Sequence, residues 1–314
     1  MQKILLKKFL LTKVLISTVI LNISCNEDIK VSDCENISGF TINENKINNK
    51  VLLIGIDGLR SDVLNKENSP FLYNLSISKF TYVNYNHIVE RPTISGPNWS
   101  SILTGTRVDK HNVSNNNFSD NSLTVYPSIF HYIEKRAPYL KTSSIVNWSP
   151  INKYIAIDAD YREMKEINDL EVYNIAKENI TSSSSDVMFL QFDELDIAGH
   201  NFGFSKNSNE YCNTLKMIDN YILNLHTLIE NKRKLDENWM FIVVSDHGGD
   251  GISHSESENI HVNRTVLILE NPHLKFRTTY ISSMSDIATT IFDFIGIEDN
   301  SFNCKKDGIS LIKK

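Results

Sequence analysis

Three apolar runs, each followed at once or after one residue by an aspartate, most strongly limit what this chain can fold into. The runs and their acidic residues are 51–56 with Asp57, 187–192 with Asp193, and 239–244 with Asp246. A run that does not alternate with polar residues is typical of a strand buried on both faces, as in a parallel sheet. We therefore expect buried strands that deliver polar side chains at their carboxyl ends.

Segments with helical spacing of apolar residues lie between and around these runs. They cover residues 70–77, 99–103, 128–135, 171–179, 209–230 and 285–295. The alternation predicts an α/β fold of three layers, in which helices flank a mostly parallel central sheet. Ligand sites of such folds form beyond the carboxyl ends of the strands, where the acidic residues fall.

The first 24 residues have the layout of a signal peptide. Lysines near the start precede an apolar stretch, 14–23, that is shorter than the roughly 20 residues of a membrane-spanning helix. The sequence around Cys25 resembles a bacterial lipoprotein cleavage site, although Asn22 stands where an aliphatic residue is expected. We predict an exported protein, either a periplasmic or cell-surface lipoprotein or a plain secreted protein. Membrane contact is expected only through a lipid at Cys25.

The rest of the chain divides into a tether and one domain. Residues 25–49 are polar and lack a sustained period, and the apolar pattern starts at about residue 50, so the catalytic domain is predicted to span 50–314. Within it, residues 147–169 have a weaker period and could form a small cap. Three cysteines remain after Cys25, namely Cys34, Cys212 and Cys304. They permit one disulfide, and the sequence leaves the pair open.

Composition excludes some classes of protein. With 314 residues, 41% of them hydrophobic and 22% charged, the chain can build one large core. The formal net charge is −6 and the two signs are mixed along the chain. Because nucleic-acid binding requires a basic surface, we expect no nucleic-acid partner.

Several side chains of the kind that bind metals follow the predicted strands. Asp57 precedes Gly58, which suits either a turn or a ligand, and Asp246 with His247 supplies the oxygen and nitrogen donors that zinc prefers. Asp196 and His200 are four residues apart, so that both can reach one ion, although a surface pair has the same spacing.

Two further residues complete the candidate set. His254 lies seven residues after His247 in a glycine-rich loop that could fold back on the site. Ser95 lies just ahead of a predicted helix, whose first N–H groups favour an anion. A serine at this place is also an ordinary helix cap. A bound metal is what would make it a nucleophile.

The candidate residues fall in motifs that resemble those of the alkaline phosphatase superfamily, in its type I phosphodiesterase/nucleotide pyrophosphatase-like branch. The motifs are, in chain order, Ile56-Asp57-Gly58, Pro92-Thr93-Ile94-Ser95-Gly96-Pro97-Asn98, Thr104-Gly105 with His111, Asp196-Ile197-Ala198-Gly199-His200, and Ser245-Asp246-His247-Gly248. The tail is similar to the family's closing helix, at 285–291, and last strand, at 307–311. The resemblance covers nearly everything after residue 50.

The resemblance implies a phosphoric ester hydrolase with a serine nucleophile, Ser95, and two zinc ions. One ion would be held by Asp57, Ser95, Asp246 and His247, and the other by Asp196, His200 and His254. Asn116 falls where that branch places an asparagine that binds the phosphoryl group, beside the Ser95-Gly96 backbone. His254 is preferred to His261 because the run 264–268 begins at the family's usual distance from the last ligand.

Departures from the family leave alternatives open. Gly96 stands where the nucleotide-cleaving members have an aromatic residue, and Ser95-Gly96-Pro97-Asn98 lacks the arginine of sulfatases. A small-molecule phosphate ester is the expected substrate, with a phosphomonoester or a phosphonate as alternatives to a diester. A surface lipoprotein that only binds a ligand is a third reading. Manganese or another divalent ion also suits the donors.

Overall fold

The structure, a computed structural model, describes residues 40–42, 48–299 and 305–313. Its centre is a seven-stranded sheet with the strand order β3-β8-β7-β2-β6-β4-β5. The five strands from β7 to β5 run parallel, and β8 is antiparallel to both β7 and β3. The strands are β2 (Asn49–Ile56), β3 (Thr81–Ile88), β4 (Thr142–Val146), β5 (Tyr161–Arg162), β6 (Val187–Phe192), β7 (Asn238–Val244) and β8 (Arg264–Glu270).

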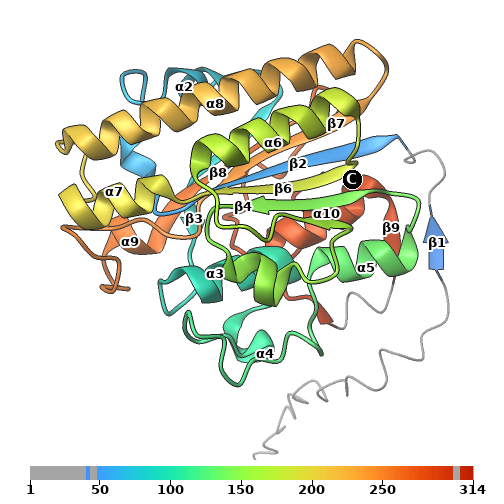
Figure 1. Cartoon of the computed structure of the whole chain (residues 1–314), viewed down its shortest axis with the longest axis horizontal. Coiled ribbons are helices and arrows are strands. Elements are labelled where there is room, and N and C mark those ends of the chain that lie inside the picture. The colour runs from blue at the N-terminus through green and yellow to red at the C-terminus, as the bar shows by residue number, and fades with distance from the viewer. Residues whose placement is uncertain (1–39, 43–47, 300–304, 314) are drawn as a thin grey trace, which may run out of the picture.

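Helices cover both faces of this sheet, which gives the three layers visible in Figure 1. One face carries α2 (Pro70–Ser76), α6 (Asp169–Ser182), α7 (Glu194–Phe202) and α8 (Asn209–Arg233). The other carries α3 (Ser95–Thr104), α5 (Ile129–Arg136), the short helix η3 (Ile151–Ile155) and α10 (Asp286–Ile295). The short elements η2 (Ser61–Val63), α4 (Val108–His111) and α9 (Ile260–Asn263) lie in the connections.

The apolar runs are continuous because each strand contributes to two cores. In β2, Val51 and Leu53 pack on the α3 side, whereas Leu52, Ile54 and Ile56 pack on the α8 side. Successive side chains of a strand point to opposite faces, so a strand covered on both sides must be apolar throughout. The predicted α/β class, the three layers and the mostly parallel sheet are confirmed.

The predicted helices are all present, and the tail differs from its prediction. Residues 307–311 were expected to form the last strand, but they form no strand, and only Ile312 makes an isolated bridge, with Phe276. The backbone N–H groups of this tail are used elsewhere. Asp307 donates to the Gly105 carbonyl, and Ile309 donates to the Asp286 carboxylate. The tail therefore ties α10 to the end of α3.

A second, smaller sheet lies near the amino-terminal ends of the parallel strands. It is antiparallel and pairs β1 (Phe40–Ile42) with β9 (Ile297–Asp299). The predicted signal peptide with Cys25, most of the tether, Cys34 and Cys304 fall outside the described residues, and Cys212 is a buried free thiol. Among the described residues, no helix has the length and apolar character that crossing a membrane requires.

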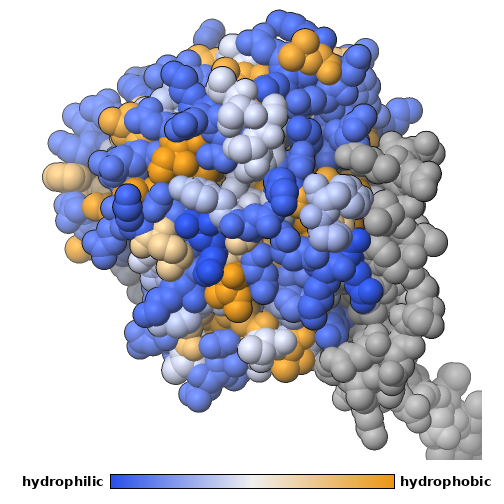
Figure 2. All heavy atoms as spheres, turned by 45° about the vertical axis from the view of Figure 1, so that its right-hand side comes forward, coloured by the Kyte–Doolittle hydropathy of each residue, from blue (hydrophilic) through white to orange (hydrophobic). Residues whose placement is uncertain are grey.

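The exposed surface is mostly hydrophilic on the face shown in Figure 2, where hydrophobic residues form separate small spots. Residues 147–169, the segment considered as a cap, include η3 and β5. Ile151, Ile155 and Ala156 of this segment are buried in the α3-side core, and Tyr154 stacks on Phe118 with ring centroids 4.7 Å apart. This segment thus packs against the domain along its own apolar side.

Candidate active site

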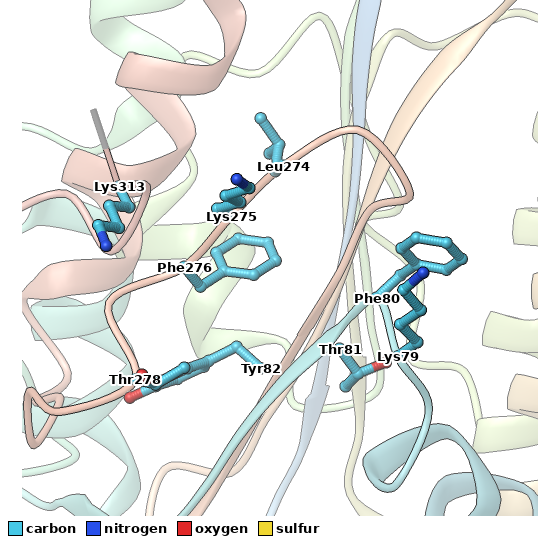
Figure 3. A pocket seen from close by; sticks show the side chains of 9 residues that line it. All are labelled: Lys79, Phe80, Thr81, Tyr82, Leu274, Lys275, Phe276, Thr278 and Lys313. Carbon is cyan, nitrogen blue, oxygen red and sulfur yellow. The ribbon is translucent and has the colours of Figure 1, made fainter.

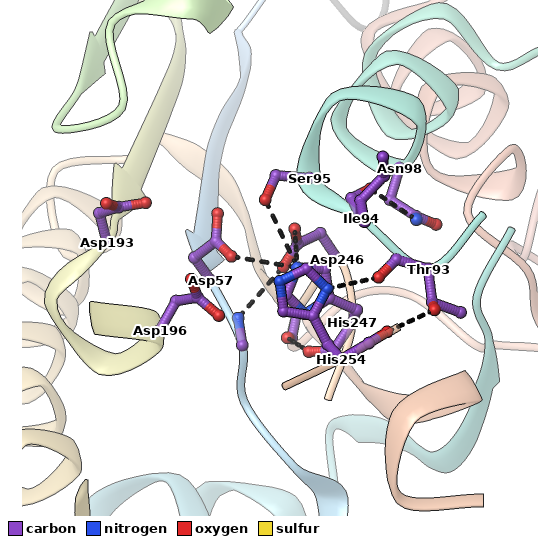
Figure 4. Close-up of polar contacts among 12 residues, drawn as sticks. Asp57, Thr93, Ile94, Ser95, Asn98, Asp193, Asp196, Asp246, His247 and His254 are labelled. Atoms are coloured by element: carbon purple, nitrogen blue, oxygen red, sulfur yellow. Dashed lines mark hydrogen bonds and ion pairs between the residues drawn. The ribbon is translucent and has the colours of Figure 1, made fainter. Parts of the chain in front are cut away.

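The candidate ligands meet because three neighbouring parallel strands deliver them to one edge of the sheet. Asp57 follows β2, Asp246 follows β7, and Asp196 lies in the first turn of α7, directly after β6. The strand order β7-β2-β6 places these three ends side by side. Figure 4 shows their carboxylates around the imidazoles of His247 and His254.

The first group of potential ligands is fully buried. Asp57, Asp246 and His247 place one ligand atom each within 4.8 Å of one another, and none of the three is more than 1% exposed. The Nε2 atom of His247 lies 3.3 Å from Asp246 Oδ2, 3.5 Å from Asp57 Oδ1 and 3.4 Å from the hydroxyl of Ser95. Ser95 thus lies beside the predicted ligands.

The second group shares His247 with the first. Asp196, His247 and His254 form it, and the rings of His247 and His254 stack with centroids 3.9 Å apart. His200 lies one helical turn after Asp196, its Nε2 atom 3.2 Å from Asp196 Oδ2 and its ring centroid 5.0 Å from that of His254. The structure therefore brings all six predicted acidic and histidine ligands into one region.

All three histidines are oriented in the same way, by a main-chain carbonyl. The Nδ1 atoms of His247, His254 and His200 contact the carbonyl oxygens of Gly248 (2.9 Å), Thr93 (2.7 Å) and Ile252 (2.9 Å). Because a carbonyl only accepts, each Nδ1 must carry the proton, which directs Nε2 toward the carboxylates. This arrangement is typical of metal-binding histidines.

One oxygen of each of the three aspartates is buried without a hydrogen-bond donor. These atoms are Asp57 Oδ1, Asp246 Oδ2 and Asp196 Oδ1. Buried polar atoms are nearly always paired, so three unpaired carboxylate oxygens at one place are the arrangement that would suit a bound cation. The donor set fits a divalent metal that takes carboxylate oxygen and imidazole nitrogen, and zinc is such a metal.

The electrostatics of the site support the same conclusion. Burial and the neighbouring carboxylates raise the pKa of Asp57 and of Asp246 well above the usual range. Burial lowers the pKa of His247 to about 3 and that of His254 to about 4, so both are neutral at pH 7. The hydrogen bond with Asp196 raises the pKa of His200 to about 9. A metal ion would relieve the repulsion among the carboxylates and would displace the His200 proton.

Helix α3 begins at Ser95 and fixes its position next to Asn116. Ser95 is the first residue of α3, so the helix begins four residues before the predicted segment. Asn116 lies next to it, with its Oδ1 atom accepting the N–H of Gly96 at 2.7 Å. This bond fixes the amide so that its NH₂ points away from Gly96. The N–H of Gly96 is therefore already paired with Asn116.

The lack of a side chain at Gly96 has a steric cause. A Cβ atom there would lie 2.9 Å from the carbonyl oxygen of Asn115 and 2.9 Å from Asn116 Oδ1. The aromatic residue found at this position in nucleotide-cleaving members therefore has no room in this packing.

Sequence reasoning missed the residues that hold Asp57 in place. Its Oδ2 atom accepts hydrogen bonds from Trp99 Nε1 at 2.9 Å and from Gln191 Nε2 at 3.2 Å. The indole can approach only because β2 has Gly55 there, where a Cβ atom would lie 2.3 Å from the ring. One signal was available, since Gln191 is the only polar residue in the strand 187–192.

Two other features of the described residues are not part of this site. A pocket of about 280 Å³ is lined by Lys79, Phe80, Thr81, Tyr82, Leu274, Lys275, Phe276, Thr278 and Lys313 (Figure 3). It lies at the opposite end of the sheet from the candidate site. The main-chain N–H of Asn271 donates to the carbonyl of Phe80, and the side chain of Asn271 donates to that of Asn238, where β7 begins. The third group of metal-type residues is His226, Glu230 and Glu270. There, both oxygens of Glu270 already accept from the guanidinium of Arg233, at 2.9 and 2.8 Å.

The fold and the converging acidic and histidine side chains together define an alkaline phosphatase-like hydrolase. The profile of the family described as type I phosphodiesterase/nucleotide pyrophosphatase matches residues 51–135 and 141–286. The chain therefore belongs to this family of metal-dependent phosphoester hydrolases. The resemblance inferred from the motifs is confirmed.

Several solved structures have a similar fold, and three of them are described below. Murine ectonucleotide pyrophosphatase/phosphodiesterase 5, as an inactive threonine-to-alanine variant in complex with AMP, is 15% identical, with a TM-score of 0.60 over 84% of this chain and 100% of that chain. A 2-O GAG sulfatase is 12% identical, with a TM-score of 0.64 over 83% and 73% of the two chains. The C-terminal periplasmic domain of EptC from Escherichia coli, in complex with Zn, is 15% identical, with a TM-score of 0.56 over 84% and 87%.

Proposed function

We propose that this protein is an exported, metal-dependent phosphodiesterase that uses Ser95 as its nucleophile. The observation that carries the proposal is the convergence of unpaired aspartate oxygens and imidazole Nε2 atoms beside one serine hydroxyl. Asp57, Asp246 and His247 would hold one ion near Ser95. Asp196, His200 and His254 would hold the other.

Ser95 is the residue that reacts with the substrate in the proposed mechanism. Zinc, when bound, supplies a Lewis acid that lowers the pKa of a nearby hydroxyl or water and offsets phosphoryl charge. Ser95 Oγ gives its proton to solvent and attacks phosphorus, a phosphoserine ester forms, and the bond to the leaving oxygen breaks, so that this oxygen departs and takes up a proton from solvent. Water then hydrolyses the ester and restores the serine.

The developing negative charge is met by groups that are already oriented. Ser95 opens α3, so its own N–H lies at the positive end of the helix and can donate to a phosphoryl oxygen, whereas the Gly96 N–H is already paired with Asn116. Asn116 turns its NH₂ away from Gly96 and can donate to the same oxygens. Donors fixed in advance of the reaction are typically the largest contribution of such a site.

Zinc is the proposed ion, in two copies per chain. Support comes from the mixture of carboxylate and imidazole donors and from the zinc found in the similar EptC domain. Manganese or another divalent ion is the alternative that metal analysis must test.

Export is part of the proposal as well. The similar EptC domain is periplasmic, and the first 24 residues of this chain read as a signal peptide. A lipid at Cys25 would hold the domain at a membrane surface. Mass spectrometry of Cys25-containing peptides from the membrane fraction would test the lipid.

The experiment that tests the function combines metal analysis with turnover. The purified domain is assayed with bis(p-nitrophenyl) phosphate and with p-nitrophenyl phosphate, before chelation, after chelation and after zinc is restored. We expect about two zinc ions per chain and diester hydrolysis that is lost and recovered with zinc. Faster monoester hydrolysis would make the protein a phosphatase, and no metal and no turnover would favour a binding protein.

A further inference from the structure

Gln191 is a buried polar side chain whose amide nitrogen and oxygen are both hydrogen-bonded and which contacts the candidate ligand Asp57. It lies on β6 and is fully buried. Its Nε2 atom donates to Asp57 Oδ2 at 3.2 Å and to Asp193 Oδ1 at 2.9 Å, and its Oε1 atom accepts the N–H of Trp148 at 2.8 Å.

These three partners leave the amide one orientation. Two carboxylates need donors and the Trp148 N–H needs an acceptor, so exchanging the amide oxygen and nitrogen would break all three hydrogen bonds. The main chain is fixed as well, because the Gln191 carbonyl accepts the N–H of Asn147 at 3.1 Å. The side chain therefore has no freedom to adjust to the carboxylate, and Asp57 must adjust to it.

The consequence for Asp57 is that its two oxygens are unequal. Gln191 and Trp99 both donate to Oδ2, and Oδ1 has no donor although it is buried. Oδ1 is also the oxygen nearest His247 Nε2, at 3.5 Å. The two donors thus turn one oxygen toward the other ligands and hold the second oxygen away from them.

We propose that Gln191 is a positioning residue that makes Asp57 a single-oxygen ligand and links it to the segment that begins at Asn147. The inference rests on the proposed function, in which Asp57 binds zinc. A neutral amide suits this task better than a cation. Arginine or lysine at this place would form an ion pair with Asp57 and Asp193 and would compete with the metal, whereas the amide leaves the negative charge in place.

The test measures zinc affinity, with folding checked separately. Gln191→Met keeps the size of the side chain and removes the three hydrogen bonds of the amide. We expect the folded variant to bind zinc about 10- to 100-fold more weakly than the wild type in competition with a chromophoric chelator. Thermal unfolding in EDTA shows whether the variant is folded.

The matched control is a buried amide in the segment that begins at Asn147. Asn152 in η3 is fully buried and bonds to Ser144 and to the carbonyl of Glu163, with no hydrogen bond to a predicted ligand. Asn152→Leu should lower stability and leave zinc affinity unchanged. Equal loss of affinity in Asn152→Leu and Gln191→Met would overturn the proposal, because the segment and not the ligand would then be responsible.

The remaining outcomes also test the proposed role of Gln191. If Gln191→Met does not fold, Trp99→Phe removes the second donor to Asp57 Oδ2, and the proposal requires weaker zinc binding there; unchanged binding overturns it. Unchanged affinity in a folded Gln191→Met variant overturns this inference alone. A wild-type chain that binds no zinc overturns the proposed function and the inference with it.

Discussion

Thr93 and His254 are joined by two hydrogen bonds in opposite directions. The Thr93 hydroxyl donates to the His254 carbonyl at 2.6 Å, and Nδ1 of His254 donates to the Thr93 carbonyl at 2.7 Å. Thr93 is two residues before Ser95, so one pair of bonds fixes a candidate ligand relative to the candidate nucleophile. An ion pair between Arg91 and Glu258 ties the same two segments at the surface.

Thr93→Val should weaken zinc binding without preventing it. Valine has nearly the same shape and cannot donate, while the bond from Nδ1 to the main chain remains. We expect a loss of about tenfold in zinc affinity, measured by chelator competition, since outer partners of ligands cost roughly 10- to 100-fold. Thr81→Val, which removes a hydroxyl paired with Ser78 at the far end of the sheet, is the control. Equal affinities in both variants would contradict the role of Thr93.

Ser95→Ala and Asp246→Ala should separate the nucleophile from the ligands. Alanine at position 95 keeps the three buried ligands beside it, so zinc should remain while turnover falls by several orders of magnitude. Asp246→Ala removes a buried, unpaired oxygen of the proposed metal site, so zinc and turnover should both be lost. Metal content by mass spectrometry and diester hydrolysis distinguish the two. Equal metal loss in both variants would refute these roles.

Asn116→Ala should reduce turnover while leaving metal binding intact. The variant removes one oriented donor and frees the N–H of Gly96, which can replace it only in part. A fall in kcat of roughly 100- to 1000-fold is expected for the loss of one such donor. Single-turnover kinetics with saturating diester would measure it. A change confined to KM would show that Asn116 binds the substrate equally in the ground and transition states.

The central strands and the helices could be predicted because their signals are local. Runs such as 239–244 are apolar throughout, since both faces of the sheet are covered. Strands β3, β4 and β5 were not anticipated. In β4, Thr142, Ser143 and Ser144 are fully or almost fully buried, so a polar sequence forms a core strand. Two of its hydroxyls find partners only in the folded chain, Thr142 with Glu134 and Ser144 with Asn152.

The candidate ligands could also be predicted, whereas the residues that orient them could not. Acidic and histidine residues at strand ends have a recognisable pattern, and Asp57 and Asp246 follow it. Trp99 and Gln191 act on Asp57 from positions 42 and 134 residues away in the sequence. The spacing of residues in the sequence cannot predict these contacts, because they depend on the strand order and on how α3 packs against the sheet.

Asp169 is a buried carboxyl outside the set of candidate metal ligands, and its raised pKa can be tested by measuring stability against pH. It is fully buried in the first turn of α6 and accepts from Asn147 Nδ2 at 2.8 Å and from the N–H groups of Asp193 (2.9 Å) and Glu194 (3.1 Å), which begin α7. Burial raises its pKa to about 7. The carboxylate therefore supports the amino terminus of the helix that carries Asp196 and His200.

The direction in which pH changes the stability contributed by Asp169 follows from its raised pKa. An unfolded aspartate has a pKa of about 3.9, so between about pH 4 and pH 7 the folded chain binds the proton more tightly than the unfolded chain. Asp169 therefore contributes stability that is complete below pH 4 and is lost as the pH rises through 7. The slope reaches at most about 1.4 kcal/mol per pH unit.

Asp169→Asn removes this titration, so the wild type should lose stability relative to the variant across that range when both are unfolded in urea with EDTA present. A difference in unfolding free energy that is constant from pH 4 to pH 8 would show that the carboxyl titrates alike in both states. Because Asp169 holds the start of α7, the same variant should also loosen the Asp196 and His200 pair, which a lower zinc affinity at pH 7 would reveal.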